Sequence, residues 1–250
     1  MKIAAKILAI DTATEACSAA LYIDGIITEK YQLAPREHTQ LILKMIESLL
    51  TDAQLKISNL DALAFGRGPG SFTGVRISTG IIQGLAFASD LPVIPISTLA
   101  SIAQLAHDQH QQKQVLAGID ARMGEMYWGC YQLNENNLMV LSGEESVSSP
   151  QLVVLDENIS AQLSARWCGA GSAWESYAEL LDEHLGHQMT QIYKDYFPRS
   201  TTIVKLAADA FQRGEMVVAA QAQPVYLRND VAKKKKDQKK GKPERVSQRG

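Results

Sequence analysis

The feature that most constrains the fold of this chain is an internal repeat. The apolar segment Ile7–Thr12 (ILAIDT) recurs as Leu116–Ala121 (LAGIDA), and each copy contains an aspartate at the same place, Asp11 or Asp120. Further strand-like segments follow each copy, so that each begins a three-stranded antiparallel meander. Self-similarity on this scale predicts two similar lobes that face each other across a cleft.

Helices and strands alternate after each meander. The expected strands are Lys6–Ala13, Cys17–Tyr22, Ile26–Leu33, Leu60–Phe65, Pro92–Ile96, Val115–Asp120, Glu125–Leu133, Leu138–Val147 and Arg166–Gly171. The expected helices are Glu37–Thr51, Val75–Ala88, Thr98–His107, Ala173–Leu185 and Thr202–Arg213, with a weaker one around Pro150–Leu155. This is an α/β protein with a βββαβα unit written twice, the actin-like, or ribonuclease-H-like, architecture in two lobes. We expect an N-terminal lobe over residues 1–108 and a C-terminal lobe over 109–230.

The last part of the chain differs from the rest in charge. Residues 231–250 contain nine Lys and Arg against two acidic residues, a net charge of +7, whereas the whole chain carries −2. A charged segment without aromatic residues is typical of a disordered extension. It could attract RNA through counterion release. Because it has no aromatic residues on which bases could stack, we favour a solvated basic tail.

The composition is that of an ordinary soluble globular protein, with 46% hydrophobic and 21% charged residues. No apolar run reaches the roughly 18 residues of a membrane span, and the N-terminus has no signal-peptide pattern. Cys17, Cys130 and Cys168 lie far apart and form no Cys-x-x-Cys motif. Disulfides and zinc ribbons are therefore not expected. We predict a cytoplasmic protein with no membrane partner.

A glycine-rich stretch, Gly66–Arg76 (GRGPGSFTGVR), joins a predicted strand to a predicted helix. Its glycines allow another group to approach the backbone closely, and a serine or threonine in it can cap the helix. Such a turn can present backbone N–H groups to an anion or a phosphate, or it can be a tight connection that binds nothing. It is neither a Walker loop nor a Rossmann fingerprint, because the residues required after the glycines are missing. The candidate phosphate-binding residues are Gly68, Gly70, Ser71, Thr73 and Gly74.

Asp11 and Asp120 end equivalent strands, one in each lobe. In actin-like ATPases such carboxylates position a magnesium–nucleotide complex, but each could equally cap a turn at the end of its strand. Arg122 follows Asp120 closely, and its guanidinium could hold a phosphate or a carboxylate across the cleft. A simple surface arginine is the alternative. We therefore add Asp11 and Arg122 to the candidate nucleotide site.

Two histidine pairs, His107 with His110 and His184 with His187, have a spacing that can place two ligands on one helix face. Both pairs lie among polar residues at helix ends, so we expect them to be solvated. No His-Glu-x-x-His motif supports a zinc protease, and Ser71 lacks the Gly-x-Ser-x-Gly elbow of a hydrolase. We predict no catalytic and no metal-binding residues.

Several motifs together resemble the bacterial TsaB (YeaZ) family. They are Ile10–Thr14 (IDTAT), Gly66–Arg76, Ile119–Glu125 (IDARMGE) and Pro224–Arg228 (PVYLR), and Pro35–Gln40 (PREHTQ) is similar to enterobacterial-type members. The motifs run from residue 10 to residue 228 and so cover nearly all of the folded chain. The long glycine motif is specific, whereas Ile-Asp-Thr alone would not be. The resemblance implies an actin-like fold and a role in making threonylcarbamoyladenosine beside the tRNA anticodon.

In that pathway a synthase makes threonylcarbamoyl-adenylate, and the actin-like subunit TsaD transfers the threonylcarbamoyl group to adenosine in tRNAs that read codons beginning with A. TsaB pairs with TsaD, and the P-loop ATPase TsaE joins them. TsaD carries a His-x-x-x-His metal motif, and its two ligand positions correspond here to Thr98 and Ile102. These side chains cannot replace two imidazoles.

The resemblance therefore implies a non-catalytic partner subunit. It would have no cofactor of its own, and ATP or ADP would be held, if at all, at the interface of the complex. An active actin-like ATPase or kinase is the second alternative. A glycoprotease-like peptidase is a distant third.

Two helical surfaces are expected to contact TsaD and, when the chain is alone, a second copy in a homodimer. One is the apolar stripe Leu41–Leu50, and the other is a smooth strip formed by two glycines four residues apart. Each stripe must also cover its own sheet in part, and tRNA would be contacted only indirectly. The residues predicted for this partner interface are Leu41, Ile42, Met45, Leu49, Arg76, Gly80 and Gly84.

Overall fold

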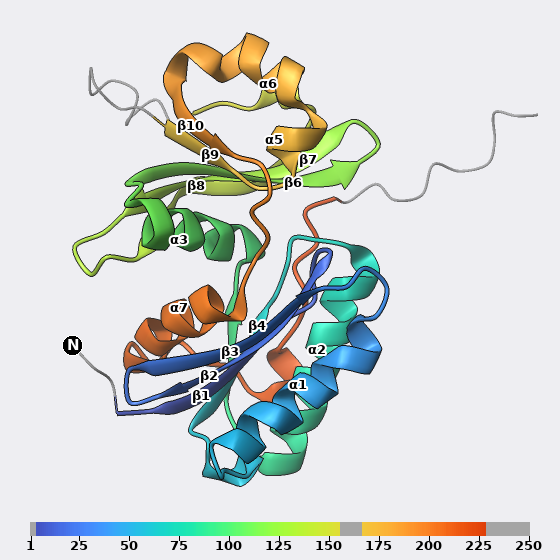
Figure 1. Ribbon diagram of the computed structural model, residues 1–250, viewed down its shortest axis with the longest axis vertical. Helices are drawn as coiled ribbons and strands as arrows, with labels where there is room; N and C mark the ends of the chain where they lie inside the picture. The colour runs from blue at the N-terminus through green and yellow to red at the C-terminus, as the bar shows by residue number, and fades with distance from the viewer. Residues whose placement is uncertain (1–3, 156–166, 229–250) are drawn as a thin grey trace, which may run out of the picture.

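The computed structural model describes residues 4–155 and 167–228, which form two α/β lobes stacked one above the other (Figure 1). The first lobe contains the strands β1 (Lys6–Asp11), β2 (Ala16–Ile23), β3 (Ile26–Leu33), β4 (Ala62–Gly66) and β5 (Val93–Ile96). Their order in the sheet is β3-β2-β1-β4-β5. The central strand β1 runs antiparallel to β2 and parallel to β4.

The second lobe repeats this plan. Its strands are β6 (Gln114–Arg122), β7 (Glu125–Leu133), β8 (Met139–Ser148), β9 (Trp167–Ala170) and β10 (Met189–Tyr193), in the order β10-β9-β6-β7-β8. Read from β8, each strand has the place of its counterpart in the first sheet, which confirms the duplicated two-lobe fold. The strand β10 was not predicted, because it is a short, largely exposed edge strand without an apolar pattern.

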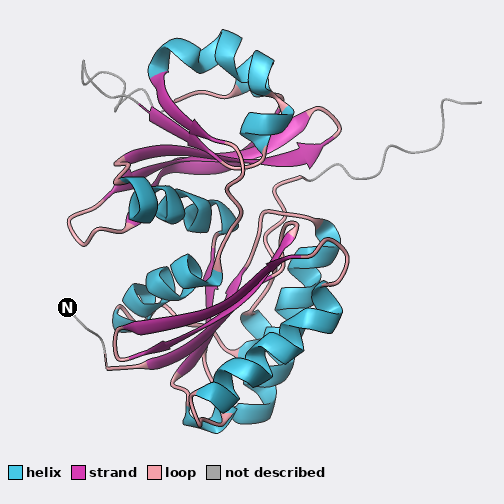
Figure 2. Cartoon of the chain, viewed as in Figure 1, coloured by secondary structure: helices cyan, strands magenta, loops and turns pink. Residues whose placement is uncertain are grey.

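Helices cover both faces of each sheet (Figure 1; Figure 2). They are α1 (His38–Asp52), α2 (Phe72–Ser89), α3 (Thr98–His110), α5 (Ala173–Ser176), α6 (Ala178–Leu185) and α7 (Ser200–Gln212). On the first sheet, α1 and α2 lie together on one face and α7 lies on the other. On the second sheet, α3 covers one face and α5 with α6 the other. The single helix predicted over 173–185 is interrupted at Tyr177.

Serine caps determine where two of these helices begin. Ser71 precedes α2, and its Oγ accepts a hydrogen bond from the N–H of Gly74 at 3.1 Å. Ser97 precedes α3, and its Oγ accepts one from the N–H of Leu99 at 3.1 Å. Such caps satisfy N–H groups that have no partner within the helix. As a result α2 begins inside the glycine motif, before the apolar pattern that predicted it.

The helices α3 and α7 are exchanged between the lobes. The helix α3 follows the first sheet in the chain but covers the second, and α7 follows the second sheet but covers the first. Leu99 and Ile102 of α3 are fully buried against the second sheet, and Ile203 and Val204 of α7 are fully buried against the first. The expected boundary at residue 108 therefore does not coincide with the packing, because the apolar face of each helix fits the opposite sheet. The chain crosses between the lobes before α3 and again before α7.

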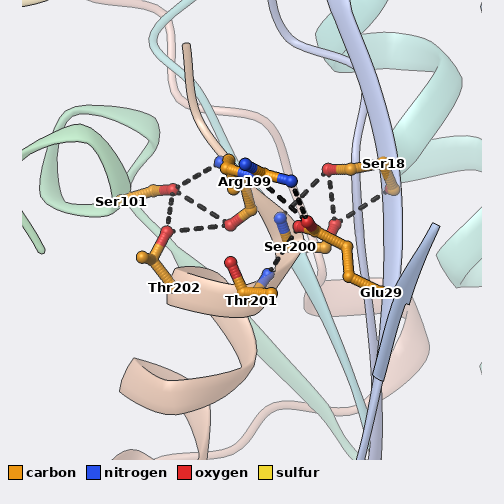
Figure 3. A network of polar contacts seen from close by, with 7 residues as sticks. All are labelled: Ser18, Glu29, Ser101, Arg199, Ser200, Thr201 and Thr202. Carbon is orange, nitrogen blue, oxygen red and sulfur yellow. Dashed lines mark hydrogen bonds and ion pairs between the residues drawn. The ribbon is translucent and has the colours of Figure 1, made fainter. Parts of the chain in front are cut away.

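A polar network holds the second crossing in place (Figure 3). The Nε of Arg199 donates to the carboxylate of Glu29 on β3 at 3.0 Å. The hydroxyl of Ser200 donates to the carbonyl of Ser18 on β2 at 2.9 Å. The hydroxyl of Ser101 on α3 accepts from the N–H of Arg199 at 3.1 Å. The start of α7 is thus tied both to the first sheet and to α3.

The predicted basic tail, residues 231–250, lies outside the described residues. None of the helices in the described residues is both long enough and apolar enough to cross a membrane. All three cysteines are buried, and none of them forms a disulfide within the described residues.

Candidate functional site

A cleft of about 980 Å³ lies between the two lobes. The first lobe contributes the loop after β1, the start of α1 and the glycine motif, and the second contributes the β6–β7 hairpin and the start of α5. Cavities of this size are typical of small-molecule sites. Its charged and polar lining residues include Glu15, Arg36, His38, Ser71, Asp120, Arg122, Tyr226 and Arg228.

The glycine motif packs against the chain just after β1. A Cβ on Gly70 would lie 2.5 Å from the carbonyl oxygen of Ala13, and one on Gly74 would lie 2.0 Å from that of Thr12. No other residue could approach so closely. Two N–H donors of the motif are already used within the chain, since that of Ser71 donates to Ala13 at 2.7 Å and that of Gly74 to the Ser71 hydroxyl at 3.1 Å. The motif is therefore at least in part a tight structural connection.

Asp11 is fully buried, unlike Asp120. Its Oδ1 accepts a hydrogen bond from the N–H of Ala13 at 3.0 Å, and its Oδ2 is buried without a hydrogen-bond partner among the described residues. The carboxyl group lies over Gly66, where a Cβ would come within 1.8 Å of Oδ2. Because burial removes water from the charged form, the pKa of Asp11 rises from 3.8 to about 7, opposed in part by the Ala13 hydrogen bond. Of the two aspartates, only Asp120 lines the cleft.

Asp120 and Arg122 line the cleft on the side of the second lobe. The N–H of Arg122 and the hydroxyl of Tyr177 both donate to Oδ1 of Asp120 at 2.8 Å. One guanidinium nitrogen of Arg122 lies 3.0 Å from Oδ2 of Asp120, and the other lies 3.4 Å from the carboxylate of Glu15 in the first lobe. Arg122 thus spans the cleft, and its partners there are carboxylates of this chain. Burial and the contact with Asp120 raise the pKa of Tyr177 to about 12, so its hydroxyl remains a donor.

The structure does not bring the seven residues predicted for a nucleotide site together. Three of them line the cleft: Gly70, Ser71 and Arg122. Three others are buried within the first lobe: Asp11, Gly68 and Gly74. Thr73 is exposed on α2, outside the cleft lining.

The PVYLR motif near residue 228 completes the cleft, a role that the sequence analysis did not assign. The guanidinium of Arg228 lies 2.6 Å from the carboxylate of Glu125. The Tyr226 hydroxyl accepts a hydrogen bond from Nε of Arg76 at 2.9 Å, and the Arg76 guanidinium lies 3.6 Å from the centre of the Phe72 ring. The motif itself was the signal available in the sequence. Its side chains gain a role only where the chain folds back beside α2.

The residues predicted to contact a partner are exposed only in part. Gly80 and Gly84 are exposed on α2, and a Cβ on either would meet nothing within 4 Å. Apolar side chains are also exposed on these helices, since Leu43 on α1 is 53% exposed and Phe87 on α2 is 87% exposed. Three predicted contact residues instead cover the first lobe's own sheet and are buried in its core: Ile42, Met45 and Leu49. Two others remain accessible, the half-buried Leu41 and the exposed Arg76.

The two positions that the resemblance predicts to correspond to metal ligands of TsaD lie inside the protein. Thr98 and Ile102 on α3 are both fully buried. His107 is also buried, not solvated as expected, and its Nδ1 lies 2.9 Å from the carbonyl oxygen of Gln112. In the described part of the chain, no group of three His, Cys, Asp or Glu residues is placed to hold a metal ion.

Comparison with known proteins identifies the family. A family model described as "TsaD: tRNA N6-adenosine threonylcarbamoyltransferase" matches residues 8–238. The Escherichia coli (strain K12) protein named tRNA threonylcarbamoyladenosine biosynthesis protein TsaB is 44% identical over 233 residues, which cover 92% of this chain and 97% of that protein. The chain belongs to the TsaB family.

Two further relatives support the assignment to this family. The TsaB protein of Haemophilus influenzae is 40% identical over 92% of this chain and 96% of its own length. A solved structure, "YeaZ from Pseudomonas aeruginosa", superposes with a TM-score of 0.79 at 43% identity, covering 89% of this chain and 100% of that chain. The stacked lobes described above are therefore a fold that this chain shares with a solved relative of the TsaB (YeaZ) family.

Proposed function

We propose that this chain is the non-catalytic partner subunit of a complex that attaches a threonylcarbamoyl group to the adenosine beside the anticodon of tRNAs that read codons beginning with A. A TsaD-type chain of the same fold carries out the transfer, a TsaE-type ATPase joins the complex, and tRNA is contacted indirectly. The name of the relative with 44% identity and the match to a threonylcarbamoyltransferase family model support a role in this pathway. The role places the protein in the cytoplasm.

The proposal that this chain is not catalytic depends on the side chains of Thr98 and Ile102. The resemblance to TsaD puts two metal-binding histidines at these positions, and both side chains are fully buried here. Ile102 belongs to the apolar cluster between α3 and the second sheet. A hydroxyl and a branched alkyl group are not ligands that can replace two imidazoles. The place of Ile102 in this apolar cluster supports a non-catalytic role for the chain.

The exposed face of α1 and α2 is the proposed partner surface, for the TsaD-type chain and, in its absence, for a second copy of this chain. The distance between two packed helices depends on the side chains at their contact, so Gly80 and Gly84 permit a close approach. The exposed side chains of Leu43 and Phe87 add apolar area of the kind that marks interaction sites. A nucleotide, ATP or ADP, would be held at the interface of the complex and would not be a cofactor of this chain alone.

Reconstitution tests the proposal. The purified chain is assayed for ATP hydrolysis and, with threonylcarbamoyl-adenylate and unmodified tRNA, for threonylcarbamoyladenosine, alone and with the TsaD- and TsaE-type proteins. We expect no turnover above background from the chain alone, and product formation by the other subunits that depends on its addition.

Turnover by the chain alone that is lost in a folded Asp11→Ala variant would overturn this proposal in favour of an actin-like ATPase or kinase. Peptide cleavage by the same preparation would favour the peptidase alternative. Full product formation without the chain would show that it is not a subunit of the transferase.

A further inference from the structure

A buried carboxylate lies where the chain first crosses between the lobes. Glu145 is on β8, at the edge of the second sheet, and its side chain is only 6% exposed. The hydroxyls of Ser97 and Tyr131 both donate to its Oε1. Burial and, next, the charge of Glu145 hold the pKa of Tyr131 well above its ordinary value, so this hydroxyl remains a donor. Because Ser97 caps α3, Glu145 ties the start of this exchanged helix to the second sheet.

The other oxygen of Glu145 faces an arginine of the first lobe. Oε2 lies 3.8 Å from a terminal guanidinium nitrogen of Arg67, which follows β4 in the glycine motif. The N–H of Arg67 donates to the carbonyl of Ile96 at 2.8 Å, and its carbonyl accepts from the N–H of Val225 at 2.8 Å. These bonds fix the backbone of Arg67 in the first lobe. The contact between Arg67 and Glu145 therefore joins the two lobes, and both residues lie outside the cleft lining.

The second crossing has an equivalent carboxylate (Figure 3). Glu29 is on β3, the counterpart of β8 in the first sheet, and its side chain is 8% exposed. One of its oxygens accepts from Nε of Arg199 and the other from the N–H of Thr201 at the start of α7, each at 3.0 Å. Each exchanged helix thus begins beside a buried glutamate on the edge strand of the sheet that it covers.

The first crossing is less completely paired than the second. The Nε of Arg67 is buried and has no hydrogen-bond partner among the described residues, and 3.8 Å is beyond hydrogen-bond distance. An unpaired buried donor is costly, whereas a guanidinium can bind a carboxylate through two N–H groups at once. A relative movement of about 1 Å would bring Arg67 to the distance of such a pair. A second, more tightly paired arrangement is therefore within reach at Glu145, whereas the contacts of Glu29 are already made.

We propose that Arg67 and Glu145 form a latch between the lobes. The second crossing is the fixed pivot, and the latch sets the angle between the lobes and hence the width of the cleft. At the cleft itself the lobes are joined by the ion pair of Arg122 with Glu15, whose side chains are 75% and 44% exposed. Such exposed pairs contribute little, so the buried latch decides the angle. This inference concerns the chain alone and does not depend on the proposed partner role.

Distances between two spin labels in one molecule test the latch. Ser58→Cys on the first lobe and Glu183→Cys on α6 provide exposed attachment sites, and the three native cysteines are buried. The doubly labelled full chain is mixed with an excess of unlabelled chain, so that only label pairs within one molecule contribute. Pulsed electron paramagnetic resonance then gives the distance distribution of the otherwise unchanged chain and of each variant.

Two variants break the latch from opposite sides. Glu145→Gln keeps an oxygen for the hydroxyls of Ser97 and Tyr131 but turns an amide N–H group, which cannot accept, toward Arg67. Arg67→Gln removes the guanidinium. We expect each to shift the mean distance, or to widen the distribution, by more than about 2 Å, the scale of a domain rearrangement. The double variant should match the single ones, because all three lose the same contact.

Glu144→Gln is the matched control, because it removes the same charge from the neighbouring, exposed position of β8. Its mean distance should stay within about 1 Å of the unchanged chain. An equal change in Glu144→Gln would overturn the latch, and so would unchanged distances in the folded Glu145→Gln and Arg67→Gln chains. A lower melting temperature with unchanged distances would mean that the contact only stabilises the fold, which also overturns the latch. If Glu145→Gln does not fold, Arg67→Gln decides alone.

Discussion

At the scale of single residues, burial makes Asp11 an unusual acid. Its pKa in the folded protein is about 7, above the ordinary value of 3.8. Between about pH 4 and pH 7 the folded protein keeps this proton whereas the unfolded chain releases it, so the free energy of unfolding falls as the pH rises. Below this window both states hold the proton, and above it both have lost it. A shift of about 3 units corresponds to about 4 kcal/mol across the whole window.

Asp11→Asn should remove this dependence, because the amide keeps the shape of the side chain and an acceptor for the N–H of Ala13 but does not ionise. Between pH 5 and pH 8 the free energy of unfolding of wild type should fall by about 3 kcal/mol more than that of the variant. Urea unfolding at the two pH values measures the difference. Asp90→Asn, at an exposed left-handed position, is the control and should behave as wild type. The same pH dependence in wild type and Asp11→Asn would contradict the prediction.

At the scale of the element, α2 contains two exposed glycines that its own lobe does not need. A Cβ at Gly80 or Gly84 would meet nothing within 4 Å. Glycine within a helix is less favourable than alanine by about 1 kcal/mol. Packing within the described residues does not require glycine at these two positions, whereas the proposed close approach of a partner helix would. Exposed apolar side chains on the same helix, such as Phe87, agree with a surface that another protein covers.

Gly84→Leu should therefore separate stability from binding. We expect the free energy of unfolding to stay the same or to rise by about 1 kcal/mol, because leucine favours the helix and a Cβ at Gly84 would meet nothing within 4 Å. The affinity for the TsaD-type chain and the self-association should fall by about tenfold or more, a change of about 1.4 kcal/mol. Urea unfolding and sedimentation measure the two properties. Gln212→Leu, at an exposed position on α7, controls for the effect of an added surface leucine. If a folded Gly84→Leu chain binds its partner with normal affinity, the interface does not include this part of α2.

At the scale of the whole molecule, the two lobes are interlocked. The helix α7 comes from the second half of the chain, yet its residues Ile203 and Val204 complete the core on one face of the first sheet. The chain after α7 also returns to the first lobe, where Val217 pairs with Val93 at the edge of β5. Each lobe therefore depends on segments from both halves of the sequence.

A fragment of residues 1–108 should consequently not fold on its own. It leaves one face of the first sheet uncovered and carries α3 without the sheet on which α3 packs. A chimera that joins residues 1–97 through a flexible linker to 198–228 should instead show a cooperative thermal transition, because α7 and the returning segment restore the missing face. Circular dichroism on heating compares the two chains. A cooperative transition in the 1–108 fragment would contradict the exchange of helices.

The sequence by itself determined the order and type of most elements, the duplication and the strand–turn–helix of the glycine motif, because alternation, helical periodicity, glycines and caps act over a few neighbouring residues. It also predicted that Arg122 could reach across the cleft, although not that its partners are carboxylates of the same chain. Tertiary structure decided which sheet α3 and α7 cover, the burial of Asp11, and the cleft that residues of both lobes line. These features depend on which apolar faces pack together, and those faces lie far apart in the sequence. The burial of a side chain, its ion pairs and its pKa are determined only by that packing.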